Sequence, residues 1–182
     1  FRNGNKQAAG RAGNSSVSNT TPPMGTFPCK GGGSNDYVYV FTSRANPDHW
    51  RRLLKVIGRE DLIGDERFET PAARVEQADE VNAMIADWTK RHTKQECMEI
   101  IGAAGVPAGA VLDTMELYND QTFEQRGIFQ TIEHPRNGTF RMPAWPVRFD
   151  GRPPPVTPSP ILGQHNEQVL SDWLSLGRDA IG

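Results

Sequence analysis

Apolar residues recur every three or four positions in several stretches of this chain, which is the spacing of helices that bury one face. The first stretch starts at Asn46-Pro47, a cap followed by a proline suited to the first helical turn, and runs to Ile57. The longest stretch runs from Thr70 to His92. The apolar positions that should anchor these two helices in the core are Trp50, Leu53, Leu54, Ile57, Val75, Ala78, Val81, Ile85 and Trp88.

A third helix is predicted to begin at Lys94, because Thr93-Lys-Gln-Glu96 has the spacing of a capping box. Gly105 lies where a left-handed C-terminal cap is needed, and Pro107 prevents continuation. The apolar segment Ala108 to Leu112 then predicts a short strand. This glycine and proline loop would allow close approach to a ligand, but its setting favours a helix stop and strand entry. The face predicted to be buried carries Cys97, Ile100, Ile101 and Ala104.

Two hairpins are predicted where strand-forming residues flank turn residues. In the first, Phe27 to Lys30 and Tyr37 to Thr42 flank a glycine-rich turn. In the second, residues 128–133 and 139–142 flank a turn that contains the strong signal Asn137-Gly138. A helical turn from 114 to 118 and a helix between Asp120 and Gly127 should lie between the hairpins. This mixture of helices and small sheets indicates an α+β fold.

The composition changes at Asp150. The proline-rich stretch from Gly151 to Pro160 cannot form a helix or an interior strand, so it should be an extended linker. A helix beginning near Leu162 follows, and its apolar stripe needs a partner surface. The chain is therefore divided into a flexible leader (1–21), a small α+β domain (22–149), and a linker with a C-terminal helix (150–182). The stripe consists of Val169, Leu170, Trp173 and Leu174.

Charge and composition exclude several classes of protein. The net charge of −2 gives no case for nucleic-acid binding, and no apolar run is long enough to span a membrane. Cys29 and Cys97 are too few for a disulfide framework and lack metal-ligand spacing, which indicates the reducing cytoplasm and no metal site. Residues 1–35 carry four basic residues and no acidic ones. This arm either meets the phosphate groups of a nucleotide-like cofactor or is simply solvated.

No nucleophile with a neighbouring base is visible in the sequence. His49 and His92 lie among charged residues and should be at the surface, whereas His134 should shape a turn before its proline. His165, at a helix start, is interpreted as structural. The segment Arg11 to Ser16 is either a mobile loop over a ligand or a disordered leader. The candidate substrate-binding residues are Gly13, Asn14, Ser15 and Ser16.

Four motifs, taken in order, resemble the family III CoA-transferases of the CaiB/BaiF type, which include formyl-CoA transferase and carnitine CoA-transferase. The motifs are Arg11-x-Gly-Asn14 followed by Pro22-Pro and Cys29-Lys30, the helix from Asn46 to Gly58, the Gly105 loop, and Leu162-Gly-x-His165 with Val169-Leu170. The resemblance implies a large doubly wound N-terminal domain that is missing here, with most of the coenzyme A site. Residues 22–149 would be the small domain, and 150–182 the arm that returns to the large domain. Because the chain starts at Phe1 without a methionine, we expect a piece of a longer protein.

The resemblance also implies acyl transfer between acyl-CoA and a carboxylic acid, through an aspartyl-CoA thioester, in an interlocked homodimer. The nucleophilic aspartate belongs to the N-terminal domain, so no catalytic residue is assigned and the fragment should be inactive alone. A glycine-rich loop that closes over the aspartate would correspond to Gly13 to Ser16. The serines at 15 and 16 depart from that pattern, which argues against formyl-CoA transferase in particular.

Two alternatives remain open. An α-methylacyl-CoA racemase shares the fold, and residues 44–111 do not separate it from a transferase. A protein of another class would be a non-catalytic interaction domain whose segment Pro153 to Pro160 docks onto a partner as a polyproline helix.

Overall fold

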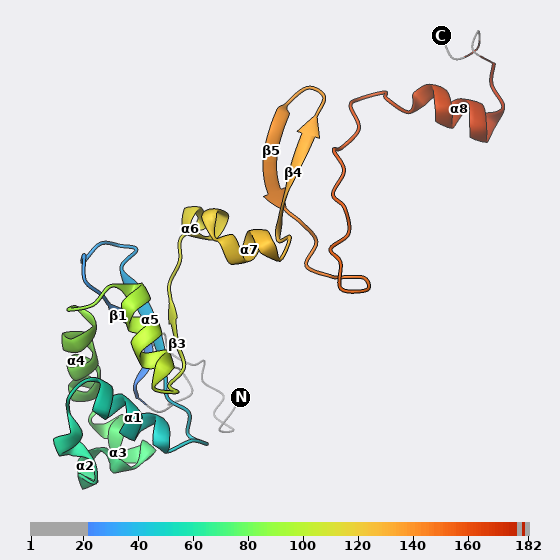
Figure 1. The fold of residues 1–182 in the computed structure, drawn as a ribbon. Helices are drawn as coiled ribbons and strands as arrows, with labels where there is room; N and C mark the ends of the chain where they lie inside the picture. Colours follow the sequence, from blue (N-terminus) through green and yellow to red (C-terminus); the bar gives the residue numbers. More distant parts are fainter. Residues whose placement is uncertain (1–21, 178–179, 181–182) are drawn as a thin grey trace, which may run out of the picture. The chain divides into compact units, whose positions relative to one another are not determined.

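The computed structural model describes residues 22–177 and Ala180. It divides into two compact units, the first ending at Asp113 and the second beginning at Thr114. Figure 1 traces the elements along the chain, blue to green in the first unit and yellow to red in the second. Both units combine helices with a small sheet, which confirms the α+β prediction. The domain boundaries at residues 22–149 and 150–182 stay predictions.

A three-stranded antiparallel sheet forms the centre of the first unit. Strand β1 (Met24–Pro28) pairs with β2 (Tyr37–Phe41), with Phe27 opposite Val38, so the first predicted hairpin is confirmed. The short strand β3 (Ala108–Ala110) pairs with the other edge of β2. Side chains alternate along β2: Val38 and Val40 are buried, whereas Tyr39 between them is exposed. One face of the sheet therefore meets the core.

Helices supply the rest of that core. Helices α4 and α5 pack against the strands, and α1 packs against α5 (Figure 1). Fully buried Trp50, Leu53 and Leu54 come from α1, and Val81 and Ile85 come from α4. The helical elements of the first unit are α1 (Asp48–Val56), the 3-10 turn η1 (Glu60–Leu62), α2 (Glu66–Glu69), α3 (Pro71–Glu76), α4 (Ala78–Thr89) and α5 (Lys94–Ala103).

The structure corrects three details of the helix predictions. The long helix expected from Thr70 to His92 is two helices, because Gln77 has the non-helical angles φ −104° and ψ 25°. Helix α1 begins at Asp48, one residue later than expected. The Asp48 amide donates a hydrogen bond to the Asn46 side-chain oxygen at 3.2 Å. Val75 is only half-buried.

The buried face of α5 also differs from the prediction. Ile100 was expected in the core but is 40% exposed. The buried positions are Lys94, Cys97 and Ile101, which lie three and four residues apart and leave Ile100 to one side. The Lys94 ammonium reaches two carbonyl oxygens, those of Asn35 and Val111, at 2.9 Å each. A lysine with a buried stem thus takes a position that an apolar residue would normally fill.

The loop after α5 is a helix stop, as predicted. Gly105 has φ +75°, its amide bonds the Gly102 carbonyl at 2.8 Å, and the Val106 amide bonds the Ile101 carbonyl at 3.2 Å. These two bonds define a Schellman motif, which the buried Val106 side chain completes. The chain then enters β3 with the Pro107 carbonyl bonded to Phe41. The predicted strand at 108–112 is confirmed but shorter.

The second unit begins with two short helices, α6 (Thr114–Asn119) and α7 (Gln121–Gln125). The side chain of Asp120 caps α7 by accepting a hydrogen bond from the Thr122 amide at 2.7 Å, and Gly127 follows its end with φ +66°. Strands β4 (Phe129–His134) and β5 (Gly138–Pro143) form the second predicted hairpin, with Ile132 opposite Phe140.

The proline-rich segment is extended and is held by one side chain of β4. The Gln130 amide donates to the Pro154 carbonyl at 3.0 Å and accepts from the Val156 amide at 2.9 Å. The final helix α8 (Asn166–Leu174) starts four residues later than predicted. None of its residues is buried, and Trp173 is 83% exposed, in line with a stripe that needs a partner.

Two glycines of α5 and its C-terminal loop should respond to alanine in opposite directions. Gly102 is helical with open space where a Cβ would lie, so Gly102→Ala should stabilise the unit by about 0.5–1 kcal/mol. Gly105→Ala should destabilise it by about 1–2 kcal/mol, because φ is positive; the Arg52 guanidinium nitrogen 2.6 Å from the new Cβ is the end of a flexible side chain and can move aside. Urea unfolding measures both changes. If both substitutions changed the free energy of unfolding in the same direction, the role of Gly105 as a left-handed helix stop would be contradicted.

Candidate functional site

The predicted loop residues Gly13, Asn14, Ser15 and Ser16 lie outside the described residues. The described part of the chain begins at Pro22, and we name Pro22 and Pro23, which lead into β1, the entry point. Pro22 and Pro23 are therefore the described residues closest in sequence to the predicted loop.

Two buried side chains hold the entry point. The Arg74 guanidinium of α3 donates through Nε to the Pro22 carbonyl at 2.9 Å. Thr42, which follows β2, donates to the Pro23 carbonyl through its amide at 3.1 Å and its hydroxyl at 3.0 Å. Arg74 and Thr42 are each only 2% exposed. We name these two residues the entry clamp.

The guanidinium of the entry clamp is a buried cation that bonds backbone groups. Its Nη1 donates to the carbonyls of Phe68 at 2.7 Å and Glu69 at 3.0 Å. The ring of Trp50 lies 5.1 Å from the guanidinium carbon, within cation-π range. Burial lowers the pKa of Arg74 to about 10, which still leaves it charged at neutral pH. Among the described residues, Trp50 Nε1 is a buried donor with no hydrogen-bond partner.

The two cysteines meet in the core. Their sulfur atoms lie 3.8 Å apart, and both thiols are buried and free. Burial raises the pKa of both, that of Cys97 to about 12. Because the thiolate is the reactive form, neither cysteine is suited to act as a nucleophile at neutral pH.

Two histidines differ from the surface positions predicted for them. His49 and His92 are both half-buried. The ring nitrogen Nδ1 of His49 accepts from the Ser43 amide at 3.2 Å, and the His92 ring stacks on Trp88 with centroids 4.1 Å apart. The error arose because charged sequence neighbours say little about contacts with distant segments.

The other two histidines, His134 and His165, lie in a turn and at a helix start. His134 accepts from the amides of Arg136 and Asn137 at 3.1 Å each, which confirms its role in the turn. His165 lies at the N-cap position of α8 and its side chain makes no capping hydrogen bond. In the described ranges, no group of three His, Cys, Asp or Glu side chains could hold a metal ion.

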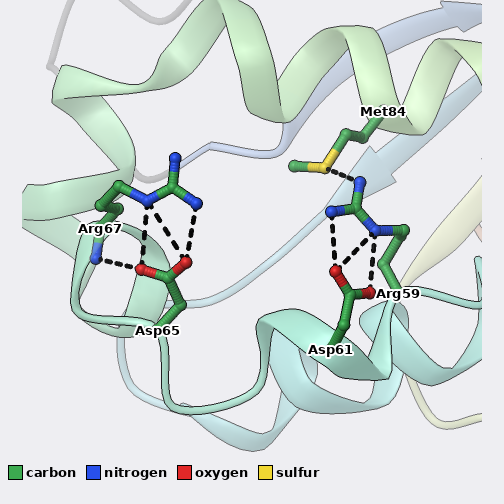
Figure 2. A network of polar contacts seen from close by, with 5 residues as sticks. All are labelled: Arg59, Asp61, Asp65, Arg67 and Met84. Atoms are coloured by element: carbon green, nitrogen blue, oxygen red, sulfur yellow. Dashed lines mark hydrogen bonds and ion pairs between the residues drawn. The ribbon is translucent and has the colours of Figure 1, made fainter.

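Two carboxylates of the first unit, Asp61 and Asp65, are paired with arginines around η1 and α2, as Figure 2 shows. Asp61 pairs with Arg59, whose guanidinium also contacts the Met84 sulfur at 3.1 Å, and Asp65 pairs with Arg67. Hydrogen bonds from these arginines lower the pKa of both carboxyl groups. Asp65 also caps α2. Carboxylates that are ionised and paired with neighbouring arginines in this way serve the local turns.

A hollow in the second unit has a volume of about 140 Å³ and is bounded by Arg148 and Trp145. Arg148 donates to the backbone carbonyls of Gly151 and Arg126, so its guanidinium braces the loop. Sites for drug-sized ligands usually measure about 300–1,000 Å³, so this hollow is too small for an acyl-CoA. No described helix is long and apolar enough to cross a membrane.

The fold is that of the CaiB/BaiF proteins. A CAIB/BAIF family protein from Brucella suis matches with a TM-score of 0.66 at 24% identity, over 84% of this chain and 38% of that protein. A Mycobacterium tuberculosis protein matches with a TM-score of 0.64 at 23% identity, over 81% of this chain and 40% of its own. At these identities the likeness shows the fold alone.

The chain belongs to CoA-transferase family III, whose family model matches residues 2–166. A formyl-CoA:oxalate CoA-transferase from Streptomyces coelicolor is 35% identical over 84% of this chain and 37% of its own length. One from Rhodopseudomonas palustris is 34% identical over 92% of this chain and 39% of its own. The chain thus spans less than two-fifths of these relatives. Their names run against the expectation, drawn from Ser15 and Ser16, that formyl-CoA transferase is disfavoured.

Sequence reasoning missed the entry clamp, although a signal was present. Arg74 continues the apolar spacing of Ala78, Val81 and Ile85 in the N-terminal direction, so an arginine occupies a core position. A charged residue on a buried stripe should always raise the question of its partner. For Arg74 that partner is the carbonyl of Pro22, 52 residues away in the chain, which periodicity does not reveal.

The Cys97 thiol should make stability depend on pH. Its pKa is raised to about 12 in the folded state, so stability is fully present below the ordinary thiol pKa of about 9 and falls as the pH rises toward 12. Cys97→Ala removes this titration but keeps those of the lysines and tyrosines. Its free energy of unfolding, measured in urea, should fall less than that of the parent between about pH 8 and about pH 10.5. Identical pH slopes would show that the thiol does not contribute.

Proposed function

We propose that this chain is the C-terminal part of an acyl-CoA:carboxylate CoA-transferase that acts through an aspartyl-CoA thioester. The observation that carries the proposal is the family match over residues 2–166, together with relatives named as CoA-transferases. Because those relatives are named for formyl-CoA and oxalate, this donor and acceptor pair is the first to test. Coenzyme A enters as part of the substrate, and no metal is required.

In this mechanism, an aspartate carboxylate attacks the thioester carbonyl of the donor, and coenzyme A leaves as a thiolate. The product is a mixed anhydride. The thiolate then attacks the aspartyl carbonyl of the anhydride, which releases the donor acid and leaves an aspartyl-CoA thioester. The acceptor carboxylate takes the place of the donor acid in the reverse sequence, so that acceptor acyl-CoA is released and the aspartate is restored.

This chain would contribute the loop Gly13 to Ser16 rather than the nucleophile. Small residues allow the loop backbone to approach a bound acyl group closely. The thiols are buried with raised pKa values, and Asp61 and Asp65 are paired with arginines, which supports placing the nucleophilic aspartate in another part of the protein. The proposal therefore includes an inactive fragment and an active complete protein in the cytoplasm.

The alternatives receive less support. The names of the relatives favour transfer of coenzyme A over racemisation of an α-methylacyl-CoA. Against the interaction-domain alternative, the Gln130 side chain already makes hydrogen bonds to the Pro154 carbonyl and the Val156 amide. This contact supports a linker that belongs to the fold over a segment free to bind a proline-recognition domain.

The chain alone should not transfer coenzyme A from formyl-CoA to oxalate, because it lacks the nucleophile, whereas the complete protein should. Separation of the CoA esters by chromatography measures both rates. Turnover by the isolated chain would place the nucleophile within it. Incorporation of solvent deuterium at the α-carbon of a 2-methylacyl-CoA by the complete protein, without transfer, would establish the racemase instead.

We also propose a homodimer. None of the residues of α8 is buried, so its apolar stripe is exposed and available to pack against a second copy of the chain. The isolated chain should self-associate through this stripe, and Trp173→Glu should shift it toward the monomer in light scattering. Gln168→Glu adds the same charge to an exposed polar position of the same helix and should change little. A monomeric parent chain at high concentration would contradict the prediction.

A further inference from the structure

We propose that Cys29 and Cys97 form a site of reversible oxidative modification, at which a peroxide converts the two thiols into a disulfide. Cys29 directly follows the last residue of β1, and Cys97 lies in α5, so the bond would tie the first hairpin to this helix. We call the two residues the thiol pair. The inference does not depend on the proposed function, because it rests on the core of the first unit alone.

The first argument is proximity. The two sulfur atoms lie 3.8 Å apart, although the residues are 68 positions apart in the sequence. A disulfide needs about 2.05 Å between its sulfur atoms, and rotation of both side chains about their Cα–Cβ bonds can share the approach. Both thiols are free. The fold itself thus brings together the two atoms between which the bond forms.

The second argument is access through a turn. Both cysteines are buried, so the closed fold protects them. Cys29 comes directly before the turn 30–34, in which every residue is exposed. The Gly33 amide donates to the Asp36 carboxylate at 2.8 Å and so helps to hold this turn closed. Opening a short exposed turn costs less than unfolding the unit, so a small oxidant reaches Cys29 first.

The third argument is the difference between the two thiols. Burial raises the pKa of Cys29, but a hydrogen bond from the Cys97 thiol opposes that rise. Burial raises the pKa of Cys97 to about 12, and the contact with Cys29 adds to this rise. Because the thiolate is the reactive form, Cys29 is the thiol that reacts with the oxidant, and Cys97 is the thiol that completes the disulfide.

The reaction has two steps. The Cys29 thiolate attacks one oxygen of hydrogen peroxide, the O–O bond breaks, and the released hydroxide takes up a proton to form water. Cys29 is now a sulfenic acid. The sulfur of Cys97 then attacks the sulfur of Cys29, the S–O bond breaks, and the leaving hydroxide takes the proton lost by Cys97. In total, two thiols lose two electrons and one peroxide is reduced to two molecules of water.

The disulfide has a structural consequence. It closes a loop between residues that are 68 positions apart, which restricts the unfolded chain. It also restrains the turn 30–34, because the residue before this turn becomes covalently bound to α5. In a reducing compartment the free thiols are the resting state, and the disulfide is transient.

The first test uses the complete protein. It is treated with hydrogen peroxide in its folded state, its free thiols are alkylated, and its peptides are analysed by mass spectrometry. We expect a peptide pair that is linked from Cys29 to Cys97 and that disappears after treatment with dithiothreitol. If peroxide instead leaves both thiols free, or oxidises them without linking them, the inference is overturned.

The route through the turn has a matched pair of variants. Asp36→Asn removes the charge but keeps an oxygen that can accept from the Gly33 amide, whereas Asp36→Ala removes the charge and the acceptor. Formation of the linked pair should be faster in Asp36→Ala than in Asp36→Asn by about threefold or more, the effect of losing one hydrogen bond. Equal rates in the two variants would overturn the route through the turn.

Hydrogen exchange reports whether the disulfide fits the core. The Lys30 amide donates to the His92 carbonyl at 2.8 Å, so its exchange follows opening of the turn. Its exchange should slow by about threefold or more in the oxidised parent, and should change by less than about twofold in peroxide-treated Cys97→Ala. Faster or unchanged exchange in the oxidised parent would show that the bond does not hold the turn closed, which would contradict the proposed site.

Discussion

The first unit depends on one constraint: a polar group removed from water must find a partner inside the protein. In the described part of this unit, from residue 22 on, four polar residues are buried, and each donates to at least one backbone carbonyl at the end of a strand or in a loop. Arg74 and Thr42 hold the chain before β1, and Thr89 holds its last residue. Lys94 joins the loop after β1 to the segment after β3. These donors fix the strand ends, while the apolar residues supply the driving force.

Local signals in the sequence were sufficient where one or two residues determine a conformation. The capping box at Thr93 and Glu96 and the left-handed Gly105 were predictable, because a cap or a positive φ angle requires few residue types. The break at Gln77 was not, since no proline or glycine marks it. The buried Lys94 and Arg74 were missed for a different reason: their acceptors are carbonyls of distant segments, which residue spacing does not encode.

For the candidate site, too, the sequence predicted one part and not another. The sequence motifs pointed to the family, and the family match over residues 2–166 confirmed it. The predicted loop at Gly13 to Ser16 lies outside the described residues, whereas the hydrogen bonds from Arg74 to Pro22 and from Thr42 to Pro23 are described. The chain spans 37% to 39% of the length of these curated relatives, and the buried polar groups described in it bond backbone carbonyls of its own fold.

The contact between Gln130 and the proline-rich segment has a consequence for the length of the C-terminal arm. From Pro153 to Val156, only Val156 has a backbone N–H, so a side-chain amide can make its two-point contact at one register only. The contact therefore fixes Val156 as the point from which the rest of the C-terminal arm extends. Residues inserted before Pro153 would enlarge a surface loop and leave the arm unchanged, whereas residues inserted between Val156 and α8 would lengthen the span that carries Trp173.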